Sequence, residues 1–221
     1  QAWNFMNNSG VCGGGNHDVV VAVVDSGVDY THEDLQASMW INSGEIPGNG
    51  IDDDNNGFVD DVHGCSVVSN VGSHSGDPLD YHGHGTHVAG IIAAQAFNEK
   101  GIAGVAFNTK IMAVQAAQYS GTLTVQDIAE GIIYATENGA DVINMSFGGY
   151  QYSQIIVNAL EVALSQAVLV AAAGNDSRNS NISPPPLYPA GLPYVIGVMA
   201  SNTDNKSCWF SNSGSHYNLY A

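Results

Sequence analysis

The sequence predicts an α/β fold of three layers, in which a mostly parallel central sheet carries helices on both faces. Short runs rich in valine, isoleucine and alanine alternate with longer segments of helical periodicity, and this β-α-β alternation is typical of parallel sheets. The chain has 221 residues, enough for one sizeable core, and contains no internal repeat or linker. We therefore expect residues 1–221 to form a single domain. No initiator methionine begins the chain, and we expect it to be truncated at both ends.

Each expected element follows from a local pattern. Residues 18–25 are apolar between two aspartates, as in a strand that is buried on both faces. Similar runs predict further strands at 110–114, 141–145, 168–173 and 194–199. Helical periodicity predicts helices at 84–97, 124–138 and 152–166. Thr124 is the expected N-cap of the second helix, and Gly139 follows its end. A polar insertion at 40–64 and a proline-containing loop at 177–193 interrupt the alternation.

The charge balance excludes two classes of partner. Asp and Glu number 21 against 4 Lys and Arg, which gives a formal net charge of −17. We expect neither nucleic acid nor an anionic membrane as a partner, because both require a basic patch. No apolar stretch approaches the length of a membrane span. An acidic chain of this kind favours cation binding instead.

The three cysteines, Cys12, Cys65 and Cys208, lack the C-x-x-C spacing of a zinc site. Buried apolar thiols are the simplest interpretation. A disulfide, for example between Cys12 and Cys65, is the alternative in a secreted protein.

Three polar residues stand where the catalytic groups of a hydrolase are expected. Asp25 and Asn175 each follow an apolar strand, and His84 begins a predicted helix that is rich in small residues. Because the carboxyl ends of parallel strands share one edge, these side chains should gather there. A carboxylate can then orient an imidazole, and an amide N–H can donate to a developing oxyanion. The structural alternatives are a satisfied strand-end aspartate, a structural histidine and a turn asparagine.

The spacing of His82, His84 and His87 also suits a metal site, so a metal-dependent hydrolase is an alternative function. No further cluster of Cys, His or carboxylates supports it. His87, one turn into the helix, is also compatible with a core histidine, and we prefer this interpretation to a metal site.

Together these segments resemble the subtilisin-like serine protease family. Asp25-Ser-Gly-Val resembles the family's aspartate block, His84-Gly-Thr-His-Val-Ala-Gly its histidine block and Ala172-Ala-Gly-Asn its oxyanion block. The resemblance covers essentially the whole chain and implies a subtilisin-like fold. It implies that Asp25 orients His84, which acts as general base and then as general acid, and that Asn175 stabilises the oxyanion. The family's Gly-Thr-Ser-Met-Ala block would follow Ala221, so we expect the nucleophile outside this chain and the chain alone to be inactive.

The resemblance also implies a substrate cleft. Ser120 and Gly121 lie where the family pairs a strand with the extended substrate. Two segments correspond to the walls of the pocket for the residue before the scissile bond: Ser146, Phe147, Gly148, Ala172, Ala173 and Gly174. Since these segments contain no acidic residue, we expect a preference for apolar or aromatic residues there. The Tyr188–Pro189 bond falls where family members can carry a cis peptide.

The insertion predicts a calcium site. It places candidate oxygen ligands at the spacing of an EF-hand loop: Asp52, Asp54, Asn56, Phe58 and Asp60. His63 stands where an EF-hand has its bidentate glutamate, and an acidic solvated loop is the alternative interpretation. The resemblance implies a second calcium site, to which the last two residues would donate carbonyls: Asp34, Gln95, Asn98, Lys100 and Ile102.

The leading interpretation is a secreted, calcium-stabilised serine endopeptidase that acts on polypeptides and is made with its own inhibitory propeptide. Secretion, calcium and the propeptide follow from the family resemblance. A catalytically inactive homologue, with the cleft retained and the serine lost, is the alternative from a different functional class.

Overall fold

The structure is a computed structural model that describes residues 13–69 and 75–221. Its elements follow in the order β1 (Val20–Asp25), η1 (Gln36–Ser38), β2 (Gly64–Ser66), α2 (His84–Ala93), β3 (Lys110–Gln115), α3 (Val125–Glu137), β4 (Val142–Met145), α4 (Gln154–Ala163), β5 (Val168–Ala172), β6 (Ile196–Met199) and β7 (Leu219–Tyr220). The strands form one sheet in the order β2-β3-β1-β4-β5-β6-β7, and every neighbouring pair is parallel. The predicted α/β class with a parallel sheet is therefore confirmed.

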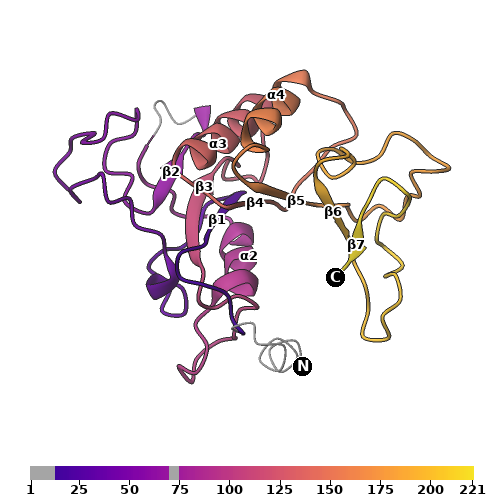
Figure 1. Cartoon of the computed structure of the whole chain (residues 1–221), viewed down its shortest axis with the longest axis horizontal. Helices are drawn as coiled ribbons and strands as arrows, with labels where there is room; N and C mark the ends of the chain where they lie inside the picture. The colour runs from indigo at the N-terminus through magenta and orange to yellow at the C-terminus, as the bar shows by residue number, and fades with distance from the viewer. Residues whose placement is uncertain (1–12, 70–74) are drawn as a thin grey trace.

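The helices cover the two faces of the sheet unequally. Figure 1 shows α3 and α4 together on one face and α2 on the other. Strand β1 is buried on both faces, as its apolar sequence predicts. Its Ala22 and Val24 join the core beneath α3 and α4, whereas Val21 and Val23 join the core beneath α2.

The face on the α2 side is covered over β1 and β3 and largely open over β5 and β6. Helix α2 packs against β1 and β3. Val170, Ile196 and Val198 are only half-buried on the same face, and Val168 is 50% exposed. We call these four residues the open face. Parallel sheets are normally covered on both sides, so an apolar surface of this kind is unusual.

The elements that sequence patterns did not predict are short. Strands β2 and β7 have 3 and 2 residues, and no apolar run marks them. Helix α2 ends at Ala93 rather than at the predicted residue 97. The Tyr188–Pro189 bond is cis, as the resemblance implies, and so is the Pro184–Pro185 bond.

The described cysteines, Cys65 and Cys208, are free thiols. Cys65 is fully buried in the core, and this burial raises the pKa of its thiol. Cys12 lies outside the described residues. Among the described helices, none combines the length and apolar character that a membrane crossing requires.

Candidate active site

Strand β1 and helix α2 bring Asp25 and His84 together. Asp25 is the last residue of β1 and His84 the first of α2, and Asp25 Oδ1 lies 2.7 Å from His84 Nδ1. The Ser26 amide donates to the same carboxylate oxygen at 2.7 Å. The His84 side chain is 46% exposed, and among the described residues its ring hydrogen-bonds to Asp25 alone. Asp25 thus holds Nδ1, which leaves Nε2 able to exchange a proton with a group in the cleft.

Gly85 allows α2 to approach β1 this closely. The Gly85 amide donates to Ser26 Oγ at 2.9 Å. A methyl group on Gly85 would lie 2.1 Å from the carbonyl oxygen of Gly27, so no larger residue fits. Gly27 itself has a φ of 97°, in the region that favours glycine. The distance between His84 and its carboxylate partner therefore depends on the absence of a side chain at Gly85.

Asp80 caps the N-terminus of α2 from outside the helix. The N-cap residue is Gly83, which has no side chain to offer. Asp80 Oδ1 accepts from the amides of His82 and Gly83 at 2.9 and 2.8 Å. Its Oδ2 accepts from the amide and the hydroxyl of Thr86 at 3.0 and 2.6 Å. Asp80 was not predicted as a site residue, yet it fixes the first turn of the helix that carries His84.

A cleft opens in front of the Asp25–His84 pair. Its lining brings together several sequence-predicted residues from separate segments: Asp25, His82, His84, Ser120, Gly121, Ser146 and Phe147. Gly121 has a φ of 81°, and its amide donates to the Gln118 carbonyl at 2.7 Å, which forms a tight turn at the rim. A methyl group on Gly121 would lie 2.9 Å from the His82 ring, so this turn packs directly on the segment before His84.

A larger apolar groove begins at Phe147, on the α3 and α4 side of the cleft. It is lined by residues that include Leu123, Ile128, Phe147, Tyr152, Ile156 and Tyr188. The rings of Tyr152 and Tyr188 pack edge to face with centroids 5.5 Å apart. A groove of this kind can accept apolar side chains of an extended polypeptide.

The side chain of Asn212 forms hydrogen bonds with the backbone that follows β5. This segment contains Asn175, whose side chain is exposed. The Asn212 side chain is fully buried. Its Nδ2 donates to the carbonyl of Ala173 at 2.9 Å, and its Oδ1 accepts from the amide of Asp176 at 3.1 Å. The backbone amide of Asn212 donates to the Gly174 carbonyl at 2.9 Å. Asn212 therefore fixes the backbone on both sides of Asn175, a role that no local pattern in the sequence indicates.

The three histidines do not form a metal site. The group of metal-capable side chains found among the described residues contains no histidine. His84 Nδ1 is bonded to Asp25, and the rings of His82 and His84 are 6.5 Å apart. His87 is exposed, so its interpretation as a core histidine is wrong. In a helix that begins at His84, the residue three positions later lies on the same face, and that face is turned to solvent.

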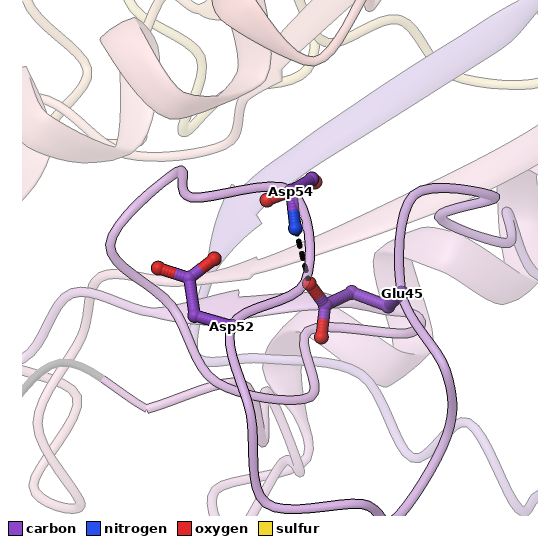
Figure 2. Close-up of side chains that lie close together, drawn as sticks. All are labelled: Glu45, Asp52 and Asp54. Carbon is purple, nitrogen blue, oxygen red and sulfur yellow. Dashed lines mark hydrogen bonds between the residues drawn. The ribbon is translucent and has the colours of Figure 1, made fainter.

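The acidic insertion gathers three carboxylates, and one of them was not predicted. Figure 2 shows Glu45 beside Asp52 and Asp54, and one oxygen of each lies within 4.8 Å of the others. That spacing fits calcium, whose oxygen ligands lie 2.3–2.6 Å from the ion. Glu45 is nearly buried, and its Oε1 also accepts from the Asp53 amide at 2.9 Å.

The predicted ligands in this loop also accept hydrogen bonds from other protein groups, and Asp60 and Asn56 are two examples. Both carboxylate oxygens of Asp60 accept backbone amides, from Asn49 at 3.1 Å and from Gly50 at 2.9 Å, and Asp60 is not part of the cluster. Asn56 lies beside Asp54, and its Oδ1 accepts from the Phe58 amide at 2.9 Å. The carboxylate cluster therefore lies in the loop that the EF-hand spacing marks, and it contains Glu45 but not Asp60.

The residues of the second predicted calcium site also converge. Asp34 is buried, and its carboxylate accepts from Asn98 Nδ2 at 2.6 Å and from the Ile102 amide at 3.1 Å. The Gln95 amide donates to the Asp34 carbonyl at 2.9 Å. The Lys100 side chain pairs with Glu33 instead, which is compatible with a role for its carbonyl alone.

The sequence profile of the subtilase family matches residues 16–221. The chain belongs to the subtilase family. This subtilase is 38% identical over 202 residues to a thermophilic serine proteinase of Bacillus sp. (strain AK1), and the match covers 91% of this chain and 43% of that protein. It is 37% identical to a cell wall-associated protease of Bacillus subtilis (strain 168), over 93% of this chain and 20% of that protein. The chain thus spans less than half the length of these relatives.

A solved structure from Pseudoalteromonas arctica PAMC 21717, described as a protease, superposes on the subtilase with a TM-score of 0.73. The two sequences are 32% identical, and the match covers 93% of this chain and 62% of that one. The subtilisin-like fold that the sequence motifs imply is therefore confirmed.

Proposed function

We propose that this subtilase chain supplies the general base, its orienting carboxylate and the oxyanion donor of a serine endopeptidase. Asp25 orients His84, and His84 Nε2 takes the proton of the attacking serine and then returns it to the leaving amine. Asn175 donates to the oxyanion of the tetrahedral intermediate. The attacking serine would come from the Gly-Thr-Ser-Met-Ala block of the family, which these 221 residues do not contain.

The observation that carries this proposal is the 2.7 Å contact between Asp25 Oδ1 and His84 Nδ1 at the rim of a cleft. A satisfied strand-end aspartate alone would not require a partly exposed histidine as its partner. Family membership and relatives named as serine proteinases support the same reaction class.

The substrate is an extended polypeptide that runs through the cleft. Ser120 and Gly121 border one side, Ser146 and Phe147 the other, and the apolar groove beyond Phe147 accepts a side chain further from the scissile bond. We place the enzyme outside the cytoplasm, with its own propeptide as inhibitor and folding aid. The name of the Bacillus subtilis relative, a cell wall-associated protease, is consistent with this location.

Calcium would stabilise the fold rather than take part in the chemistry. Glu45, Asp52 and Asp54 supply a carboxylate cluster whose mutual repulsion a divalent cation would relieve. Asp34 and Asn98, with carbonyls of their neighbours, would hold a second ion.

The experiment compares peptide hydrolysis by the full-length protein with that of its His84→Ala and His87→Ala variants. His84→Ala should abolish nearly all activity, whereas His87→Ala, exposed on the same helix, should keep it. Asp25→Asn should lower kcat by about 10⁴-fold. Near-normal turnover in His84→Ala would overturn the proposal. Failure of the wild-type protein to react with a fluorophosphonate probe would favour the inactive homologue.

A further inference from the structure

The sequence contains three Asn-Gly pairs, and two of them lie in the acidic insertion: Asn49-Gly50 and Asn56-Gly57. The third, Asn138-Gly139, follows helix α3. Asparagine is a thermolabile residue, and it deamidates fastest before glycine, where no side chain hinders the next amide nitrogen. The glycine nitrogen bonds to Cγ of the asparagine, the Cγ–Nδ2 bond breaks, and ammonia leaves with the amide proton. Water then opens the succinimide ring to aspartate or isoaspartate.

Two hydrogen bonds engage the reacting groups of the Asn56-Gly57 pair. The Gly57 amide donates to Asp52 Oδ2 at 2.9 Å, and Asn56 Oδ1 accepts from the Phe58 amide at 2.9 Å. Ring closure removes the proton that Asp52 holds and turns the side-chain carbonyl away from the Phe58 amide, so both bonds oppose it. The surrounding space adds no obstacle, because a methyl group on Gly57 would meet nothing within 4 Å.

The Asn49-Gly50 pair has the same arrangement. The Gly50 amide donates to Asp60 Oδ2 at 2.9 Å, and Asn49 Oδ1 accepts from the Ile51 amide at 2.7 Å. The Asn138-Gly139 pair differs, because the Gly139 amide donates at 3.2 Å to a backbone carbonyl, that of Thr136. In the insertion, therefore, each glycine amide is held by a carboxylate from elsewhere in the loop.

The product of deamidation does not suit the closed loop. Asn56 Nδ2 donates to Asp54 Oδ2 at 3.2 Å and to Asp61 Oδ2 at 2.9 Å. Asn49 Nδ2 donates to Asp53 Oδ2 at 2.7 Å. Deamidation replaces each donor with a carboxylate, so these hydrogen bonds become contacts between like charges. Since Asp61 is fully buried, its contact with a second carboxylate is especially unfavourable.

We propose that Asn49 and Asn56 are modification sites, at which spontaneous deamidation makes an opening of the acidic insertion irreversible. While the loop is closed, its own carboxylates protect both asparagines. Once the loop opens, both pairs are free to react, and the new carboxylates prevent it from closing again. The reaction needs only water as co-reactant and is independent of the proposed peptidase chemistry.

The test follows deamidation by peptide mapping and mass spectrometry in a mildly alkaline buffer. It uses the full-length His84→Ala protein, which lacks the proposed general base and should not digest itself. Excess chelator is present throughout, so that calcium binding does not differ between samples. Asn49 and Asn56 should react at least about 10-fold more slowly than in a synthetic peptide of residues 46–62, the scale of one hydrogen bond to a charged group. Equal rates in protein and peptide would overturn the protection.

Two variants in the same background test each carboxylate separately. Asp52→Ala should accelerate the reaction of Asn56 by about 10-fold and leave Asn49 unchanged, whereas Asp60→Ala should do the reverse. Asn138 is the internal reference and should keep its rate. Equal acceleration of both loop asparagines in both variants would overturn the assignment of a separate carboxylate to each pair. Acceleration of Asn138 as well would signal loss of the whole fold, and the comparison of the unmutated loop with the peptide then decides.

A second measurement tests whether the product prevents closure. Asn56→Asp mimics the product, and Asn55→Asp is the matched control because it adds the same charge at the next residue. Asn55 Nδ2 lies 3.5 Å from the backbone carbonyl of Asp53 and contacts no carboxylate. In chelator, Asn56→Asp should lower the Tm clearly more than Asn55→Asp does. Equal Tm values for the two variants would overturn the irreversibility.

Discussion

Asp80 and Thr86 are joined by two hydrogen bonds to one carboxylate oxygen, from the Thr86 hydroxyl at 2.6 Å and from its amide at 3.0 Å. This pair replaces the side-chain cap that Gly83 cannot supply at the start of α2. Since His84 is the first residue of that helix, the position of the imidazole depends on a carboxylate that never contacts it.

Removal of this cap should destabilise the protein. Asp80→Ala leaves the amide of Thr86 in the first turn of α2, and the amides of His82 and Gly83 before it, without their acceptor, at a cost of about 1 kcal/mol. We expect a lower Tm and a lower kcat, because the first turn of α2 loosens. Thermal melts and peptidase assays of the full-length protein provide the measurement. A variant with unchanged Tm and kcat would contradict the capping role.

The Asp80 cap should also depend on pH. Burial alone would raise the pKa of Asp80, but hydrogen bonds from Thr86 and from the Gly83 and His82 amides outweigh it and lower the pKa. A lowered pKa adds stability that is fully present above the ordinary aspartate pKa of about 3.9 and is lost as the pH falls through the folded value. The Tm difference between wild type and Asp80→Asn should therefore be constant at neutral pH and shrink below about pH 4. A difference that grows on acidification would refute this sign.

The close approach of α2 to β1 predicts opposite effects for two glycines of the same helix. Gly85→Ala places a methyl group 2.1 Å from the Gly27 carbonyl oxygen, which must push His84 away from Asp25. Gly90→Ala meets only Ile102 Cδ1, at 4.0 Å, and should stabilise the helix by about 0.5–1 kcal/mol. We expect Gly85→Ala to lose activity and Tm, and Gly90→Ala to lose neither. Equal behaviour of the two variants would show that the contact does not constrain the pair.

The bonds that Asn212 makes around Asn175 predict a defect in kcat rather than in KM. Asn212→Asp keeps the acceptor for the Asp176 amide but loses the donor to the Ala173 carbonyl. If Asn175 shifts as a result, kcat should fall toward the 10²–10³-fold loss typical of a missing oxyanion donor. Asn218→Asp is the matched control, because the exposed Asn218 uses only its oxygen, as acceptor for Gly197. Comparable kcat values for the two variants would argue against the positioning role.

Calcium removal should lower thermal stability without changing the contact between Asp25 and His84. A ligand that binds only the folded protein adds about 2.7 kcal/mol at 100 times its Kd. Excess chelator should therefore lower the Tm, and Glu45→Gln should blunt the response to added calcium. Asp60→Asn should leave the response intact, because Asp60 is not part of the carboxylate cluster. The same Tm in calcium and in chelator would exclude both sites, and loss of the response in Asp34→Ala alone would leave only the second.

Most of the fold could be predicted because buried strands and helices have a recognisable pattern of apolar residues in the sequence. Strand β1 is apolar on both faces, and helix α3 begins at the expected Thr124 cap, whose hydroxyl accepts from the Asp127 amide. Strand β2 could not be predicted, since its three residues contain one glycine and one serine and gain their stability by pairing with β3.

The site residues that could be predicted lie at the ends of regular elements, whereas those that were missed lie in loops. Asp25 and His84 stand at the ends of regular elements, where motif and topology both mark them. Asp80, Asn212 and Glu45 lie in loops and act on segments that only the folded chain brings to them. Glu45 also lies outside the EF-hand spacing, so a pattern built on that spacing excludes it.

The open face, which consists of Val168, Val170, Ile196 and Val198, should affect the self-association of this chain in solution. An apolar surface on a parallel sheet attracts another apolar surface, and a chain with a net charge of −17 resists this attraction only while the charges are unscreened. Added salt should therefore drive the isolated 221-residue chain into reversible clusters that light scattering can detect. Because the chain combines a high net charge with one exposed apolar surface, its self-association should depend strongly on ionic strength.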